Sequence, residues 1–163
     1  MKNLAVVTFI LAVFAFSITS CKKVDDPQAV TVMENAGEAT ISGIVYADLN
    51  DTLPNSIEYA PAGTQLLVRV DPNQFPEVSV LNSASTDYMY VPAEVGANGT
   101  YSVKVKAPKN GGTVRIYPPE FRANYIDGAG DTESAEFYYN GTYLTVSVFE
   151  GATVIQDFSY DRR

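Results

Sequence analysis

The 163-residue chain contains no histidine and only one cysteine. Histidine is the commonest general base near neutral pH and the commonest metal ligand, so its absence removes most hydrolase and zinc-site schemes. A single cysteine cannot form an internal disulfide. Basic residues are also scarce, because 11 Lys and Arg stand against 19 Asp and Glu and give a net charge of -8. Nucleic-acid binding needs clustered basic side chains, so we expect no nucleic-acid partner.

Without histidine, carboxylates are the main catalytic groups that remain to be considered. Pairs of carboxylates can act alone in glycoside hydrolysis. The acidic residues of this chain, however, fall mostly in predicted loops and turns, and the sequence shows no pairing between them. We therefore expect that the protein is not an enzyme.

Long apolar runs are missing except near the N-terminus. Residues 4–16 are apolar with one threonine and follow a short basic start. This run is shorter than the roughly 20 residues of a membrane span and is typical of a signal peptide, which we place at residues 1–20. Thr19 and Ser20 precede the sole cysteine, Cys21, and this triplet resembles the lipobox of lipoproteins from Gram-negative gut bacteria. The resemblance implies that Cys21 carries lipids, palmitate among them; the alternative is that Cys21 is a small buried residue.

Residues 21–38 contain Pro, Gly and charges without a regular hydrophobic period, which predicts a flexible tether. Asp25 and Asp26 soon after the cysteine resemble the signal that exports such lipoproteins to the outer face of the outer membrane. An ordinary solvated linker is the alternative. The expected location is the outer membrane or the cell surface, with the membrane as a partner through the lipid anchor.

From residue 39 to residue 163 the pattern is that of β-structure. In residues 100–106 Tyr101, Val103 and Val105 alternate with Ser102 and Lys104, a period of two that is typical of a half-buried strand. The same alternation predicts that further apolar residues point inward: Leu66, Val68 and Val70; Val114 and Ile116; Leu144, Val146 and Val148. No segment of ten or more residues has an amphipathic helical period.

Three Asn-Gly pairs separate these runs, at Asn98-Gly99, Asn110-Gly111 and Asn140-Gly141. Both residue types tolerate positive φ, so each pair predicts a hairpin turn. Short strands with frequent turns and one polar face indicate two packed sheets. The predicted fold is all-β, an antiparallel β-sandwich of about seven or eight strands.

Four segments carry a resemblance to a known family. They are ISGIVYAD, EYAPAGTQLLV, NGTYSVKVKAP and VFEGATVIQDFSY, within residues 39–160. Their order resembles prealbumin-like (transthyretin-like) sandwich modules, which include the carboxypeptidase regulatory-like domain and the B-type repeats of bacterial surface adhesins. The resemblance implies a Greek-key topology. Residues 78–95 and 118–136 follow the pattern less well, which leaves the strand count there open.

The loop after the first predicted strand offers oxygen donors at Asp48, Asn50, Thr52 and Glu58. Calcium takes six to eight oxygen ligands, and alternate loop residues can point at one centre. In the adhesin repeats a similar loop follows the pattern Asp-x-Asn-x-Asp-Gly and ends in glutamate, so this loop resembles a degenerate calcium site. Asp48, Asn50 and Glu58 are its candidate ligands. The alternative is a solvated loop whose Asp and Asn side chains cap turns through their own backbone.

Two further patterns suggest surface functions. Asp51-Thr52-Leu53 resembles the O-glycosylation acceptor of Gram-negative gut bacteria, with Thr52 as the modified residue. Aromatic side chains surround the turn at residues 140–141, and they form either a binding edge for sugars or proteins or cross-strand pairs of the sheet; they are Phe137, Tyr138, Tyr139 and Tyr143. The predicted function is a surface lipoprotein with a binding or accessory module, for glycans or for other surface proteins.

Overall fold

The computed structural model describes residues 36–53, 56–75 and 88–163. The predicted signal peptide, Cys21 and the tether up to residue 35 lie outside the described residues. The described residues form ten strands and two 3-10 turns: β1 (Glu38–Ala47), β2 (Gln65–Val70), η1 (Pro72–Gln74), β3 (Met89–Glu94), η2 (Ala97–Gly99), β4 (Thr100–Lys106), β5 (Gly112–Tyr117), β6 (Phe121–Ile126), β7 (Thr132–Tyr138), β8 (Leu144–Val148), β9 (Thr153–Ile155) and β10 (Phe158–Arg162). No helix in this part of the chain is long and apolar enough to span a bilayer.

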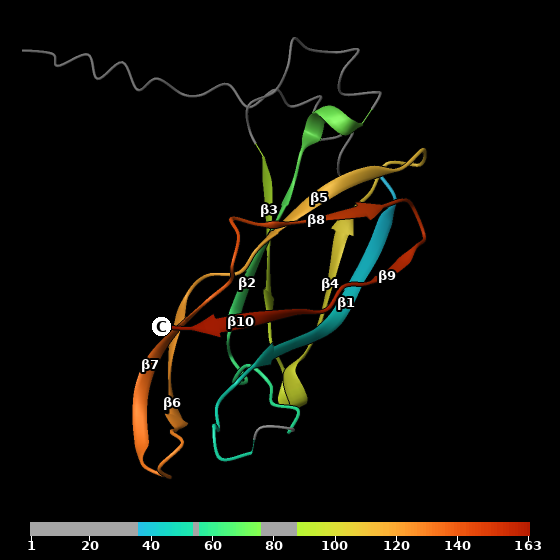
Figure 1. Ribbon diagram of the computed structural model, residues 1–163. Coiled ribbons are helices and arrows are strands. Elements are labelled where there is room, and N and C mark those ends of the chain that lie inside the picture. Colours follow the sequence, from blue (N-terminus) through green and yellow to red (C-terminus); the bar gives the residue numbers. More distant parts are fainter. Residues whose placement is uncertain (1–35, 54–55, 76–87) are drawn as a thin grey trace, which may run out of the picture.

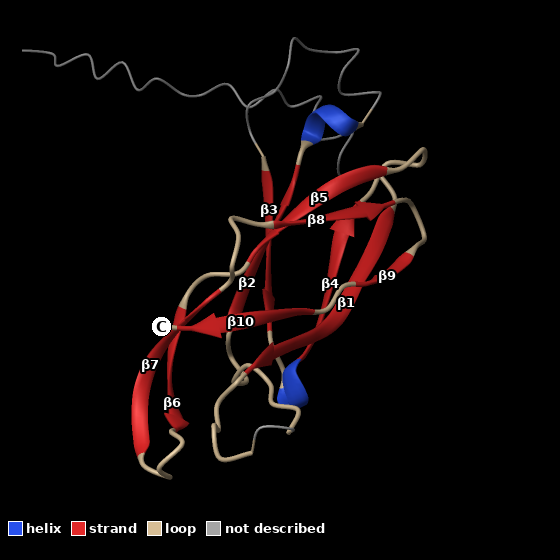
Figure 2. Cartoon of the chain, in the orientation of Figure 1, coloured by secondary structure: helices blue, strands red, loops and turns tan. Residues whose placement is uncertain are grey.

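The strands form two sheets, which confirms the predicted β-sandwich (Figures 1 and 2). One sheet has the order β4-β1-β10-β7-β6, with β9 also paired to β1, and the other has the order β3-β2-β5-β8. The count of ten exceeds the expected seven or eight, because the poorly patterned residues 118–136 hold β6 and most of β7 and because β9 is short. Figure 1 shows β6 and β7 as a pair that extends beyond the rest of the sandwich.

Inward-facing side chains follow the predicted alternation. Tyr101, Val103 and Val105 of β4 are buried, while Ser102 and Lys104 are exposed. The other residues predicted to point inward are also buried: Leu66, Val68, Val70, Val114, Ile116, Leu144, Val146 and Val148. They meet the inner faces of β1, β7 and β10, and the shared core lies between the two sheets.

Two pairings depart from the predicted antiparallel arrangement. β1 runs antiparallel to β4 but parallel to both β9 and β10. The C-terminal segment lies along β1 as a strand broken at Gln156 and Asp157, where the Asp157 carboxylate accepts a hydrogen bond from the Ile44 N–H at 2.7 Å. Gly43 permits this close approach, because a Cβ there would lie 2.1 Å from the Gln156 carbonyl oxygen. Side-chain alternation reports which face a residue occupies and not the direction of the neighbouring strand, so the sequence did not reveal the parallel pairing.

The prediction that the Asn-Gly pairs close hairpins is wrong. Asn98 and Gly99 do adopt positive φ, at 59° and 70°. Each of the three pairs, however, joins strands of opposite sheets: β3 to β4, β4 to β5, and β7 to β8. A tight hairpin instead joins β6 to β7, where the Asp127 carboxylate accepts hydrogen bonds from the backbone N–H groups of Ala129 and Asp131. Asn-Gly determines the local backbone conformation, whereas the next strand joins the sheet on which its apolar face can be buried.

Candidate functional site

The outer face of the four-stranded sheet carries an array of tyrosine and arginine side chains. We call it the tyrosine–arginine face and define it by Arg69, Tyr88, Arg115, Tyr117 and Tyr143. Arg69 lies opposite Arg115 in the pairing of β2 with β5. Because residues paired across a sheet share a face, both arginines project away from the buried Val68, Val70, Val114 and Ile116. The strand backbones, and not a loop, therefore hold the two guanidinium groups.

The side chains of this face contact one another in a continuous sequence. The Arg69 guanidinium lies 4.0 Å from the ring centroid of Tyr88 and 5.3 Å from that of Tyr117. The Tyr117 and Tyr143 ring centroids are 5.5 Å apart, and the Arg115 guanidinium lies 4.4 Å from the Tyr143 ring. These are cation–π and tilted aromatic contacts of the ordinary kind. The order across the face is thus Tyr88, Arg69, Tyr117, Tyr143, Arg115.

No carboxylate of the described residues pairs with either arginine. Within the described ranges, neither Arg69 nor Arg115 forms an ion pair with Asp or Glu. The pKa of the Arg115 guanidinium is raised above its ordinary value, first by side-chain hydrogen bonding with Tyr117 and then by electrostatic interactions with Tyr143 and Tyr117. Tyr88 is 39% and Tyr143 is 37% exposed, so solvent reaches this face. The arrangement can bind an anionic group and an adjoining flat surface at the same time.

The three tyrosines predicted as a binding edge do not form one cluster. Tyr143 belongs to the tyrosine–arginine face. Tyr139 packs edge-on against Phe158 at 5.9 Å, and Tyr138 lies 5.1 Å from the Arg163 guanidinium. Tyr138 and Tyr139 are half-buried. Because β7 and β8 belong to different sheets, the turn at residues 140–141 sends Tyr143 to the opposite side of the sandwich.

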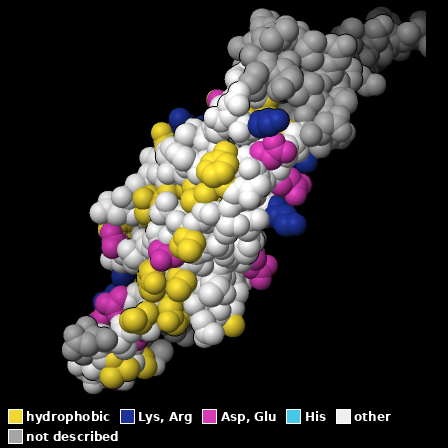
Figure 3. Space-filling model, turned by 90° about the vertical axis from the view of Figure 1, so that its right-hand side faces the viewer, with side chains coloured by type: hydrophobic (Ala, Val, Ile, Leu, Met, Phe, Trp, Pro, Cys, Tyr) yellow, Lys and Arg dark blue, Asp and Glu magenta, His cyan; other side chains and the backbone are white. Residues whose placement is uncertain are grey.

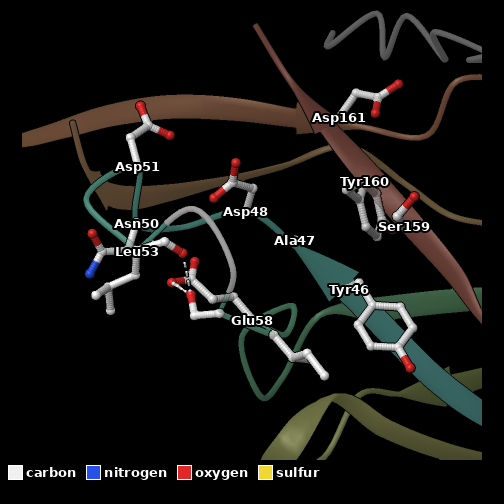
Figure 4. A pocket seen from close by; sticks show the side chains of 12 residues that line it. Tyr46, Ala47, Asp48, Asn50, Asp51, Leu53, Glu58, Ser159, Tyr160 and Asp161 are labelled. Atoms are coloured by element: carbon white, nitrogen blue, oxygen red, sulfur yellow. Dashed lines mark hydrogen bonds between the residues drawn. The ribbon is translucent and has the colours of Figure 1, made fainter. Parts of the chain in front are cut away.

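A second feature is an open depression beside the end of β1 (Figure 4). It has a volume of ≈ 740 Å³, and Asp48, Asn50 and Glu58, the candidate calcium ligands, all line it. In Figure 4 the Glu58 side chain lies next to Leu53, whereas Asp51 and Asp161 lie on the far side of the depression.

Two of the candidate ligands bind their own loop. The Glu58 carboxylate accepts hydrogen bonds from the Leu49 N–H and, at 3.0 Å, from the Ser56 hydroxyl. The Asn50 side-chain oxygen accepts hydrogen bonds from the Thr52 N–H at 3.0 Å and from the Thr52 hydroxyl at 2.6 Å. These contacts match the alternative of a loop that caps its own turns. Among the described residues, no group of three or more His, Cys, Asp or Glu side chains is arranged to hold a metal ion.

Sequence reasoning did not identify the strongest contact of this loop. The Asp51 carboxylate accepts two hydrogen bonds from the Arg162 guanidinium, at 2.8 and 2.9 Å. The same guanidinium lies 3.9 Å from the centroid of the Tyr125 ring. Backbone hydrogen bonds from Asp51 to Ile126 and from Ile126 to Leu49 complete the contact. The loop is therefore attached to the β6–β7 pair, while the Thr52 side chain stays exposed.

Other apolar side chains at the surface are dispersed. Figure 3 shows one face of the molecule, on which hydrophobic side chains form several groups, with acidic and basic side chains between them and along both margins. The most exposed large apolar residues are Leu53, Ile57, Phe149 and Ile155. Scattered apolar residues are normal on protein surfaces. The tyrosine–arginine face is therefore the stronger candidate site.

The fold and this face define a two-sheet β-sandwich with an aromatic and cationic outer surface on its smaller sheet. No protein-family model matches the chain, and no curated protein matches it significantly. Among solved structures, it is similar to a minor pilin of Streptococcus agalactiae, with 9% identity over 78% of this chain and 46% of that chain and a TM-score of 0.44. A DUF3823 family protein of Parabacteroides merdae shares 14% identity over 78% of this chain and 48% of that chain, with a TM-score of 0.37.

The major plantain pollen allergen is a further similar structure. It shares 15% identity over 76% of this chain and 92% of that chain, with a TM-score of 0.36. The chain spans about half the length of the pilin and of the DUF3823 family protein.

Proposed function

We propose that the chain is a non-enzymatic lipoprotein of the outer membrane or the cell surface, whose β-sandwich is a binding or accessory module. The tyrosine–arginine face carries the binding part of this proposal. Tyrosine and arginine are enriched among the residues that dominate binding energies. Here the sheet and the mutual contacts of the side chains hold them in place, which lowers the conformational entropy lost when a ligand binds.

The binding role is tested by photo-crosslinking in the native cells. A photoreactive residue replaces Thr145, which lies opposite Arg115 on β8 and is exposed. We expect a reproducible crosslinked product that disappears when Arg69→Gln and Arg115→Gln are combined. The control carries the photoreactive residue at Ser102, an exposed position of β4 in the other sheet. Equal products at both positions, or none at Thr145, would contradict a binding role for this face.

The lipid anchor rests on the resemblance of the segment ending at Cys21 to a lipobox. Cys21→Ala is expected to remove the incorporation of labelled palmitate and to leave an unprocessed precursor. Protease treatment of whole cells then tests the exposure of the module, and Asp25→Ala combined with Asp26→Ala tests the export signal. Normal maturation and membrane partitioning of Cys21→Ala would exclude lipidation at this residue.

Calcium-dependent binding is a second candidate, because Asp48, Asn50 and Glu58 line one depression. A calcium ion would have to compete with the Leu49 N–H for Glu58 and with Thr52 for Asn50. Calorimetry on the mature protein with millimolar calcium, the range of weak extracellular sites, tests this role. Heat of binding that is lost in Asp48→Asn supports it, and the absence of both heat and a shift in melting temperature rejects it.

We also propose that Thr52 is O-glycosylated. The side chain is exposed, although its hydroxyl donates a hydrogen bond to Asn50. The intact mass of the protein from its native cells is expected to exceed the mass of the processed and lipidated chain, and Thr52→Ala is expected to remove this excess. An unchanged mass difference in Thr52→Ala would place the modification elsewhere.

A further inference from the structure

We propose that the tyrosine–arginine face binds an acidic polysaccharide, a polymer whose sugars carry carboxylate or sulfate groups. The inference deepens the proposed binding function and rests on it. Arg69 and Arg115 lie directly opposite each other on neighbouring strands. Like charges at such paired positions repel and destabilise a sheet. An anion bound between the two guanidinium groups would remove this repulsion.

Two acidic residues near this face belong to the described part of the chain, and neither forms an ion pair with Arg69 or Arg115. Asp71 follows Arg69 by two residues, but its carboxylate accepts two hydrogen bonds from Asn73 at 2.9 Å and caps the turn η1. Glu94, on the neighbouring β3, accepts a hydrogen bond from Gln65 at 3.3 Å. In a chain with 19 acidic and 11 basic residues, a pair of arginines that has no carboxylate partner among the described residues stands apart from the average surface. The local charge is therefore complementary to an anion.

The position of the array on the sheet favours a polysaccharide over a peptide. Extended peptides usually bind a sheet at its edge, where unpaired backbone groups are available. Arg69 and Arg115 lie on the two central strands, whose backbone groups are already paired on both sides. What the face offers is the flat surfaces of Tyr88, Tyr117 and Tyr143 in contact with the two guanidinium groups. Aromatic faces can stack against sugar rings, and the planar guanidinium suits carboxylate and sulfate oxygens.

A single-stranded nucleic acid also combines flat rings with negative charge. The net charge of -8 opposes it, because a nucleic acid needs basic side chains along its whole bound length. A short acidic segment that meets only two arginines has no such requirement. We therefore assign the face to an acidic polysaccharide and use an oligonucleotide as a competitor.

The test measures binding of the purified mature chain, in detergent, to immobilised polymers. Polygalacturonate presents carboxylates, dextran sulfate presents sulfates, and plain dextran presents neither. We expect binding to polygalacturonate, to dextran sulfate or to both, weaker at high salt, and no binding to plain dextran. The polymer that the protein binds with the higher affinity identifies the preferred anionic group.

Variants connect the binding to this face. Arg69→Gln and Arg115→Gln are each expected to weaken binding by about tenfold, the effect of losing one charged hydrogen bond. The control is Lys104→Gln, which removes an exposed positive charge from β4 of the other sheet and is expected to change affinity less than about twofold. Arg69→Lys keeps the charge but loses the planar guanidinium, so we expect an intermediate loss.

Three results would overturn the inference: no binding to either acidic polymer, an equal loss in the lysine control, or displacement by an oligonucleotide at lower concentration than by the polymer itself. These results are distinct from failure of the proposed function. If neither polymer binds but the crosslinked product at Thr145 still depends on the two arginines, the face is a binding site for another class of ligand. If that product is also missing, the binding function itself is wrong.

Discussion

Replacement of Asp51 by asparagine tests how the loop after β1 is held. Asp51 receives both hydrogen bonds of its ion pair from one terminal nitrogen of Arg162. The other terminal nitrogen, Nη1, is buried without a hydrogen-bond partner in the described part of the chain. Asp51→Asn removes the negative charge but retains one accepting oxygen. The substitution therefore weakens the charged contact without changing the volume of the side chain.

The expected loss follows from the exposure of the pair. The side chains of Asp51 and Arg162 are 28% and 25% exposed, so solvent screens the interaction only in part. A hydrogen bond to a charged group contributes about 1.5–3 kcal/mol, and a fully exposed ion pair contributes about 0–1 kcal/mol. Between these limits we expect Asp51→Asn to lower the free energy of unfolding by about 2 kcal/mol. For a domain of this size, the melting temperature should fall by about 6 °C.

Urea unfolding measures the loss, and hydrogen exchange locates it. Exchange should accelerate at the N–H groups of Asp51 and Ile126, which bond across the contact. The matched control is Asp48→Asn, because Asp48 is an exposed aspartate of the same loop without a side-chain hydrogen bond or ion pair among the described residues. An equal effect of the two variants, or no change in exchange at Ile126, would refute the reasoning.

Two more predictions concern the core and its closest backbone contact. Burial raises the pKa of the Tyr101 hydroxyl, with a further contribution from Asp157, and burial also raises that of Tyr160. The phenols ionise at lower pH in the unfolded chain than in the folded one, so stability is retained below about pH 10 and falls as the pH rises further. Urea unfolding between about pH 9 and 11.5 should show that the free energy of unfolding falls less steeply with pH in Tyr101→Phe. An unchanged slope of this free energy against pH would contradict the prediction. Gly43→Ala should cost about 2 kcal/mol or more, since its Cβ would collide with backbone atoms of the β9–β10 segment. Gly128→Ala, where nothing lies within 4 Å, is the control, and equal melting temperatures of the two variants would exclude the proposed collision.

The strands of the core were predictable because their signal is local. Tyr101, Val103 and Val105 alternate with polar residues, and burial of such a face requires an extended chain against an apolar layer. In β6, Phe121, Ala123 and Tyr125 alternate with exposed residues but are themselves only half-buried, and β7 begins with three exposed residues in succession. The sequence pattern therefore left the strand count open there.

The candidate site was only partly predictable. Tyr143 was identified from the sequence, but it was grouped with Tyr138 and Tyr139, which are its neighbours along the chain. Its neighbours in space are Tyr117 and Arg115, on a strand that begins some 30 residues earlier. The alternation that points Val68 and Val114 inward also points Arg69 and Arg115 outward. Nothing in either strand, taken alone, indicated that the two arginines lie opposite each other.

The sequence by itself determined the all-β class, the inward face of the principal strands and the positive φ of Asn98-Gly99, because each depends on residues within a few positions of one another. Only the tertiary structure decided the pairing of strands, the parallel run of β9 and β10 beside β1 and the assembly of the tyrosine–arginine face. These features depend on which apolar surfaces are buried together. That choice minimises the free energy of the whole core, and no single segment encodes it.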